Sequence, residues 1–126
     1  MAITYTISRQ DLLITAFATG IIRADELHGL IKSLLADPGF VAGLRGLYDS
    51  RYAEPDITVM QLAEVASEVR ELQNRGLERL AIVAQSQTTY RVAKTFSIIA
   101  RAIGINVDVF RELDPARAWL DEGPNS

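Results

Sequence analysis

The side chains that could do chemistry in this chain are few, and their types exclude most catalytic arrangements. The 126 residues contain no cysteine and one histidine, His28. The lack of cysteine excludes disulfides, thiolate metal ligands and cysteine nucleophiles. A serine-based triad would need His28 as its base. His28 follows Leu27 on a predicted helix and lies off the apolar stripe, so we expect it to face solvent. We therefore assign no catalytic residue.

No pattern in the sequence indicates a cofactor or a metal. Neither of the glycine-rich phosphate loops, GxGxxG or GxxxxGK[ST], occurs. Asp49 and Asp56 flank one polar segment, but Arg51 stands between them, which makes a poor metal site. We therefore predict a protein that binds neither a cofactor nor a metal. Enzymatic activity is the least favoured of the three functions considered.

The best cluster of polar side chains follows the predicted parallel strands. Ligands of open parallel sheets bind beyond the carboxyl ends of the strands, and a helix N-terminus at that edge offers free N–H groups to an anion. The candidate ligand-binding residues are Arg51, Tyr52, Ser86, Thr88, Thr89, Tyr90, Arg91 and Lys94. In the competing interpretation, Ser86 or Thr88 only caps the helix and Arg91 is solvated.

The elements that would position these residues follow from hydrophobic periodicity. Strands are predicted over residues 3–7, 12–19, 46–49, 80–84 and 105–109. Ile3, Tyr5 and Ile7 alternate with threonines, which is typical of a half-buried strand, and we place this strand at or near an edge. Gly20 is expected to end the second strand, and residues 51–56 are expected to form a loop. The continuous apolar run 80–84 predicts a central strand buried on both faces.

Helices are predicted around Leu27 to Leu35 and over residues 58–74, 89–103 and 115–121. Thr58 and Gln61 have the spacing of a capping box, and Asp114 before Pro115 indicates a helix start. The residues expected in the core are Ile31, Leu34, Ile82, Phe96 and Trp119.

The order of elements, β-β-α-β-α-β-α-β-α, predicts an α/β fold. We expect a mixed, mostly parallel five-stranded sheet with an N-terminal antiparallel hairpin and four helices. The length suits one domain, residues 1–126, with a frayed tail at 121–126. The net charge of −3 argues against nucleic-acid binding. We expect a cytoplasmic protein, because the sequence shows no signal peptide and no transmembrane segment.

Four segments together resemble a known family. They are residues 34–38 (LLADP), 47–51 (LYDSR), 79–84 (RLAIVA) and 107–120 (VDVFRELDPARAWL). Their order and spacing are similar to those of STAS domains, and more closely to those of SpoIIAA-like bacterial proteins. The resemblance implies that the helices lie mainly on one side of the sheet and that the protein is a non-enzymatic regulatory or protein-interaction module.

Anti-sigma-factor antagonists of that family carry a phosphorylated serine directly after an aspartate, at the start of the second helix. Here Ile57 follows Asp56, and the glycine of the motif is missing. Thr58 lies one residue late and is the remaining candidate for phosphorylation. We predict that Thr58 is a structural cap and that the antagonist-type phosphoserine is absent.

Besides the least favoured enzymatic activity, two functions remain open at this point. The leading one is an interaction or regulatory module whose partner is an unknown protein or a second copy, because the third helix is apolar around much of its circumference. Val92, Phe96 and Ile99 are the candidate interface of such a homodimer. The alternative is a small-molecule or lipid carrier, with Tyr52, Tyr90, Val92 and Phe96 around an apolar cavity. A deep apolar pocket favours the carrier, and a flat apolar patch favours the interaction module.

Overall fold

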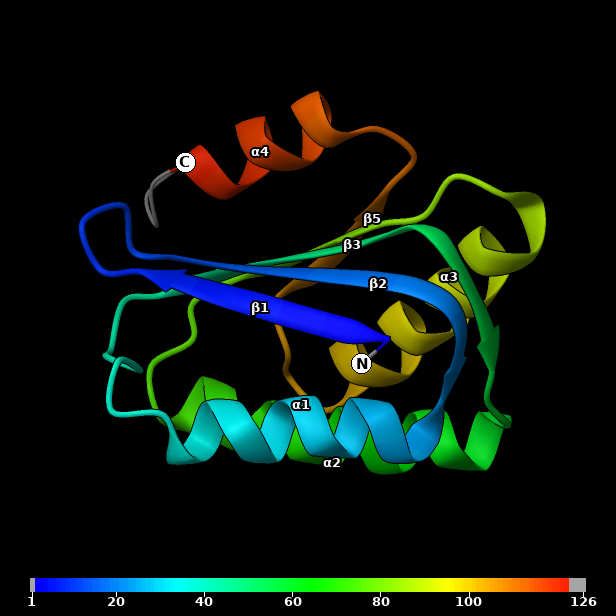
Figure 1. The fold of residues 1–126 in the computed structure, drawn as a ribbon, viewed down its shortest axis with the longest axis horizontal. Coiled ribbons are helices and arrows are strands. Elements are labelled where there is room, and N and C mark those ends of the chain that lie inside the picture. Colours follow the sequence, from blue (N-terminus) through cyan, green and yellow to red (C-terminus); the bar gives the residue numbers. More distant parts are fainter. Residues whose placement is uncertain (1, 123–126) are drawn as a thin grey trace.

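The computed structural model describes residues 2–122, which form one mixed sheet of five strands and four helices (Figure 1). The elements are β1 (Ile3–Ser8), β2 (Leu13–Arg23), α1 (Ala24–Ala36), β3 (Arg45–Asp56), α2 (Val59–Asn74), β4 (Leu80–Val83), α3 (Gln87–Ala102), β5 (Val107–Phe110) and α4 (Leu113–Asp121). The strands lie in the order of the sequence, β1-β2-β3-β4-β5. β1 and β2 pair antiparallel and the other neighbours pair parallel, which confirms the predicted fold class.

The predicted positions of the strands hold with one difference. β1 is an edge strand, as expected, and β4 is an interior strand, but the middle of the sheet is β3. β4 has the apolar sequence of a central strand because both of its faces are covered. Ile82 packs in the cluster formed with α1–α3, whereas Ala81 and Val83 pack in the cluster formed with α4.

β2 and β3 are longer than the sequence pattern predicts. Gly20 does not end β2, because it pairs with Ala53 and the parallel ladder continues to the pair of Arg23 with Asp56. The predicted loop 51–56 is therefore the second half of β3. This half pairs with β2 alone, since the pairing of β3 with β4 ends at Asp49. A strand with one open side tolerates polar residues, which is why its sequence resembles a loop.

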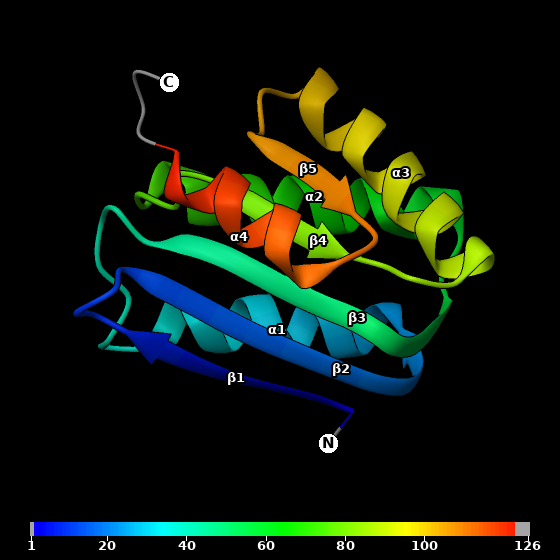
Figure 2. The same ribbon diagram turned by 90° about the horizontal axis from the view of Figure 1, so that it is seen from above.

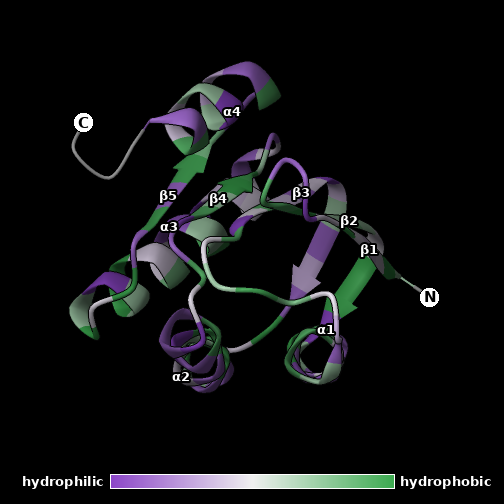
Figure 3. Ribbon diagram, turned by 90° about the vertical axis from the view of Figure 1, so that its left-hand side faces the viewer, coloured by the Kyte–Doolittle hydropathy of each residue, from purple (hydrophilic) through white to green (hydrophobic). Residues whose placement is uncertain are grey.

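The helices form two layers of unequal size (Figure 3). α1, α2 and α3 cover one face of the sheet, as the resemblance implies, and α4 lies on the other face against β3, β4 and β5. Two arginines, Arg45 at the start of β3 and Arg79 directly before β4, hold the C-terminal end of α4. Arg45 donates to the carbonyl of Leu120 at 2.7 Å, and Arg79 donates to the carbonyl of Trp119 at 2.6 Å.

Three details of α4 differ from the prediction. The helix begins at Leu113 after Glu112, so Asp114 lies in the first turn and is not the N-cap. Trp119 is only half-buried. Its ring packs against the guanidinium of Arg79, 5.0 Å from the ring centroid, and not wholly inside the core. Asp121, in the expected tail, is the last residue of α4; residues 123–126 lie outside the described part of the chain.

The other predicted core residues, Ile31, Leu34, Ile82 and Phe96, are buried. His28 does not simply face solvent. Its Nδ1 lies 2.6 Å from Oε1 of Glu68, so the pair links α1 to α2. The side chain of His28 remains 32% exposed.

Shortening Leu34 should destabilise the fold strongly. Leu34 on α1 is 5% exposed and packs in the main core cluster. We expect Leu34→Ala to lower the free energy of unfolding by roughly 2–5 kcal/mol, through lost transfer energy and an enlarged cavity. Chemical denaturation measures this change. Val59→Ala, at a side chain that is 64% exposed, is the control and should change the stability by less than about 0.5 kcal/mol. A loss below about 1 kcal/mol for Leu34→Ala would contradict this packing.

Thr58 should matter as a cap. Its Oγ1 accepts from the N–H of Gln61 at 3.1 Å, and its own N–H donates to Oε1 of Gln61 at 2.9 Å, which confirms the predicted capping box. We expect Thr58→Ala to cost about 1 kcal/mol of unfolding free energy, and Thr58→Ser to restore most of it. The absence of a phospho-switch stays a prediction. Phosphothreonine at this position in protein from the native host would contradict it.

Candidate functional site

Two hydroxyl groups of the predicted polar site, those of Ser86 and Thr89, form hydrogen bonds inside the fold. Ser86 is the N-cap of α3, as in the competing interpretation, and its Oγ accepts from the N–H of Thr89 at 3.2 Å. The Ser86 hydroxyl donates to Oγ1 of Thr89 at 2.8 Å, and the Thr89 hydroxyl donates to the carbonyl of Ala53 at 2.9 Å. This relay ties the first turn of α3 to the second half of β3. Thr88 is exposed beside it.

The positive charge of Arg51 is neutralised locally. Its Nε and one terminal nitrogen each lie 3.0 Å from a carboxylate oxygen of Asp49, which is 6% exposed. The hydrogen bonds to Asp49 raise the pKa of Arg51 above its ordinary value. Arg51 also borders a polar surface hollow with Gln85, Leu113 and two further carboxylates, Glu112 and Asp114. Acidic side chains on both sides make this hollow a poor anion site.

The remaining candidates do not converge on the relay. The Tyr90 ring is covered by the guanidinium of Arg111 at 4.0 Å. Tyr52 is 60% exposed, Arg91 is exposed and Lys94 is half-buried. Anion binding by these residues stays a prediction.

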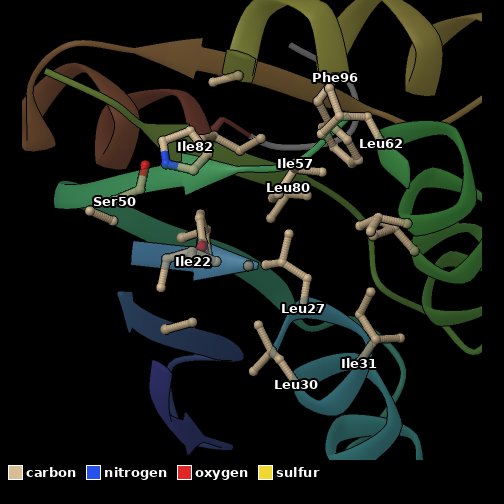
Figure 4. A pocket seen from close by; sticks show the side chains of 18 of the residues that line it. Ile22, Leu27, Leu30, Ile31, Ser50, Ile57, Leu62, Leu80, Ile82 and Phe96 are labelled. Carbon is tan, nitrogen blue, oxygen red and sulfur yellow. The ribbon is translucent and has the colours of Figure 1, made fainter. Parts of the chain in front are cut away.

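A different feature, an apolar cavity, lies between the sheet and α1–α3 (Figure 4). Its volume is about 140 Å³. The helices contribute bulky aliphatic and aromatic side chains, including Leu27, Leu30, Ile31, Leu34, Leu62, Val65, Val69, Leu72, Val92 and Phe96. The strands contribute Ile14, Ala16, Ile22, Gly46, Leu47, Tyr48, Ser50, Ala53, Pro55, Leu80 and Ile82. Ile57, Leu77, Thr89 and Ala93 complete the lining.

Small residues of the sheet explain why this space is not filled. Ala16 of β2 and Ala53 of β3 line the cavity, where a strand usually presents a branched side chain, whereas Leu77 and Leu80 fill the space beside Gly46. α2 packs between α1 and α3 rather than directly on the strands. The side chains of α2 reach the strands within the main core cluster, yet a cavity remains beside the alanines of the sheet.

Polar groups in the lining are few and mostly satisfied. The Ser50 hydroxyl donates to the carbonyl of Val83 at 2.7 Å, and Thr89 is held by Ala53. Burial raises the pKa of the Tyr48 phenol, and the nearby carboxylate of Glu26 raises it further. Tyr48 therefore stays protonated at neutral pH, and its side chain belongs to the cavity lining.

The structure separates the residues predicted around a cavity. Val92 and Phe96 line it, whereas Tyr52 and Tyr90 do not belong to its lining. Phe96 is 6% exposed and thus not on the surface, and Val92 and Ile99 are half-buried. A homodimer through this face of α3 stays a prediction. The small residues among the apolar positions of β2 and β3 were the signal in the sequence that points to a cavity.

Comparison with solved structures identifies the fold of this chain. No protein-family model matches the sequence, and no curated protein is significantly similar to it. Among solved structures, an anti-sigma factor antagonist from Mycobacterium paratuberculosis superposes with a TM-score of 0.64 at 18% identity, covering 95% of each chain. An uncharacterised DUF3478-family protein from Shewanella loihica, described as having a SpoIIAA-like fold, gives a TM-score of 0.59 at 17% identity, covering 94% of this chain and 92% of the other.

This chain has the SpoIIAA-like, STAS-type fold. The described residues of this SpoIIAA-like chain contain no helix long and apolar enough to cross a membrane. Within residues 2–122 there is also no group of three or more His, Asp or Glu side chains arranged to hold a metal ion.

The Thr89 relay should be structural and sensitive to loss of its hydroxyl. Thr89 is 5% exposed and joins α3 to β3. Thr89→Val keeps the shape but leaves the Ala53 carbonyl and the Ser86 hydroxyl without this partner, so we expect a loss of about 1–3 kcal/mol in unfolding free energy. Thr89→Ser keeps the hydroxyl and should cost less. Equal stability of wild type and Thr89→Val in thermal denaturation would contradict the assignment.

Proposed function

We propose that this protein is a non-enzymatic STAS-type module that binds a small apolar molecule in the cavity between its sheet and α1–α3. The observation that carries the proposal is the cavity itself, with its almost entirely apolar lining. An apolar ligand binds such a site by leaving water, and Tyr48 offers one hydrogen bond that would favour a ligand with a single polar group.

The energetic cost of an empty cavity supports occupation. At about 24 cal/mol per Å³, an unfilled volume of about 140 Å³ costs on the order of 3 kcal/mol. That is a large fraction of the stability of a typical small domain, about 5–15 kcal/mol. An engineered apolar cavity of about 150 Å³ in another protein stays dry and binds benzene or xenon, which sets the expected ligand size.

The partly buried residues of the lining indicate where a ligand would enter. Leu27 of α1, Ile57 between β3 and α2, and Val92 of α3 line the cavity and also reach solvent. All three lie near the carboxyl ends of β2 and β3, the edge at which ligands of parallel sheets usually bind. The side chains of Val59 and Met60 at the start of α2 are 64% and 77% exposed. They add apolar surface next to this edge of the sheet.

An exposed apolar cluster favours a second function, protein interaction. Phe17, Ile21 and Tyr52 are 38%, 56% and 60% exposed, and the rings of Phe17 and Tyr52 lie 6.1 Å apart. These residues belong to β2 and β3, on a part of the sheet that α4 leaves open (Figure 2). Exposed apolar patches often mark interaction sites, and binding of a regulatory partner here is compatible with ligand binding in the cavity.

Benzene tests the cavity directly, because it matches the volume and carries no polar group. In a titration followed by ¹H–¹⁵N NMR, we expect saturable shifts that centre on the lining residues of α1, α2 and α3. Ala93→Leu adds bulk inside the cavity, where Ala93 is 7% exposed, and should weaken binding by at least about tenfold. Ala102→Leu makes the same change at an exposed position of the same helix and should leave binding unchanged.

Native mass spectrometry of protein purified from its own host complements the titration, since it detects a retained ligand by mass. A cavity that takes up no benzene in a folded wild type, or binding that is unaffected by Ala93→Leu, would contradict the proposal and leave the interaction module as the function.

A further inference from the structure

The open edge of the sheet carries an unusual strand. β1 pairs only with β2 in the described part of the chain, and Figure 2 shows it as the outermost element on that side. Its sequence, ITYTIS, contains no charged residue and no proline. Proteins that remain monomeric usually protect an edge strand with a lysine, a proline, a bulge or a covering segment. β1 has no lysine, no proline and no bulge, and it pairs regularly with β2 over its whole length.

The first five residues of β1 form a palindrome, Ile3-Thr4-Tyr5-Thr6-Ile7. Two copies of this strand that pair antiparallel about a two-fold axis at Tyr5 place Tyr5 opposite Tyr5, Thr4 opposite Thr6 and Ile3 opposite Ile7. Every side chain therefore meets its own type. A two-fold interface requires such self-complementarity, and threonine pairs across antiparallel strands are favourable.

The backbone groups that point to the open edge of β1 belong to the same residues that would form hydrogen-bonded pairs in this two-fold arrangement. The carbonyl of Ala2 accepts from the N–H of Thr19 at 2.9 Å. Because hydrogen-bonded positions alternate along an antiparallel ladder, Thr4 and Thr6 also direct their backbone groups to β2. Ile3, Tyr5 and Ile7 direct their N–H and C=O groups to the open edge. In the two-fold arrangement these same residues form the hydrogen-bonded pairs, Tyr5 with Tyr5 and Ile3 with Ile7.

The side chains are already placed for this contact. Thr4 and Thr6 are exposed on the face opposite α1, whereas Ile3 is buried and Tyr5 is half-buried on the α1 face. The Tyr5 hydroxyl donates to a carboxylate oxygen of Asp37 at 2.7 Å.

We propose that β1 is a homodimerisation edge, through which two copies of this chain form one continuous sheet across a two-fold axis centred on Tyr5. The partner is a second copy rather than an unrelated peptide, because only an identical strand reproduces the match at every position. This interface is separate from the predicted one on α3 and does not depend on the cavity. A contact of one short strand is smaller than the about 1,200–2,000 Å² of standard interfaces, so we expect weak, reversible association.

Charge variants at the exposed threonines test the edge without touching the core. Thr4→Lys/Thr6→Lys places lysine opposite lysine twice across the two-fold axis, and should weaken the dimer by at least about tenfold. Thr4→Lys/Thr6→Glu is the matched control, because it places lysine opposite glutamate and should keep the dimer. Sedimentation equilibrium up to about millimolar concentration, the range for weak complexes, measures the dissociation constants, and circular dichroism verifies the fold of both variants.

Two cysteine variants test the register, since the chain has no cysteine of its own. Thr4 and Thr6 of opposite copies form a non-hydrogen-bonded pair with Cα atoms about 4.5 Å apart, within the range of a disulfide. Under oxidising conditions a mixture of Thr4→Cys and Thr6→Cys proteins should therefore cross-link, whereas each protein alone should not. A wild type that stays monomeric, a dimer unaffected by Thr4→Lys/Thr6→Lys, or cross-linking of single variants without the mixed product would each overturn the proposal.

Discussion

The fold depends on apolar burial between the sheet and the helices α1, α2 and α3, which cover one of its faces. The side chains of the two layers differ in size. α1, α2 and α3 present leucine, isoleucine, valine and phenylalanine to a sheet whose facing positions include Ala16 and Ala53. Apolar burial holds the two layers together, because the side chains on both sides leave water. Close packing is nevertheless incomplete, since α2 rests between α1 and α3 instead of on the strands. The space left between the layers is the most distinctive feature of the protein.

The polar residues at the carboxyl end of the sheet support this arrangement. The relay from Ser86 through Thr89 to Ala53 fixes the start of α3 on β3, and the Ser50 hydroxyl ties β3 to the end of β4. Each of these hydroxyls satisfies a group inside the fold, which leaves it less free to hold an anion. Of the candidate ligand-binding residues, Ser86 and Thr89 thus help to frame the cavity beside them.

The unequal helix layers have a second consequence. α4 covers β3, β4 and β5, so it leaves the outer faces of β1 and β2 uncovered, whereas α1 covers their inner faces. The apolar cluster around Phe17 and the free edge of β1 lie on this uncovered side. One side of the molecule therefore encloses an apolar space, while the other offers surfaces to partners, and the two properties are independent of each other.

The sequence by itself determined which elements form and in which order. Alternation in β1, the apolar stripes of α1 and α2, and the capping box at Thr58 are local signals, because neighbouring residues alone set the period and the cap. The similarity to the SpoIIAA-like fold also followed from this order. The palindrome in β1 was visible as well, but its backbone groups are free only because β1 lies at an edge.

Tertiary structure decided everything that depends on residues far apart in the chain. Residues 51–56 are a strand because β2 supplies a parallel partner, and His28 is fixed because Glu68 lies opposite it on α2. The cavity arises from the sizes of side chains on six elements and the loops between them. A local pattern reports which face of an element is apolar, but not how far away the opposing layer lies, and that distance determines whether a core is filled or hollow.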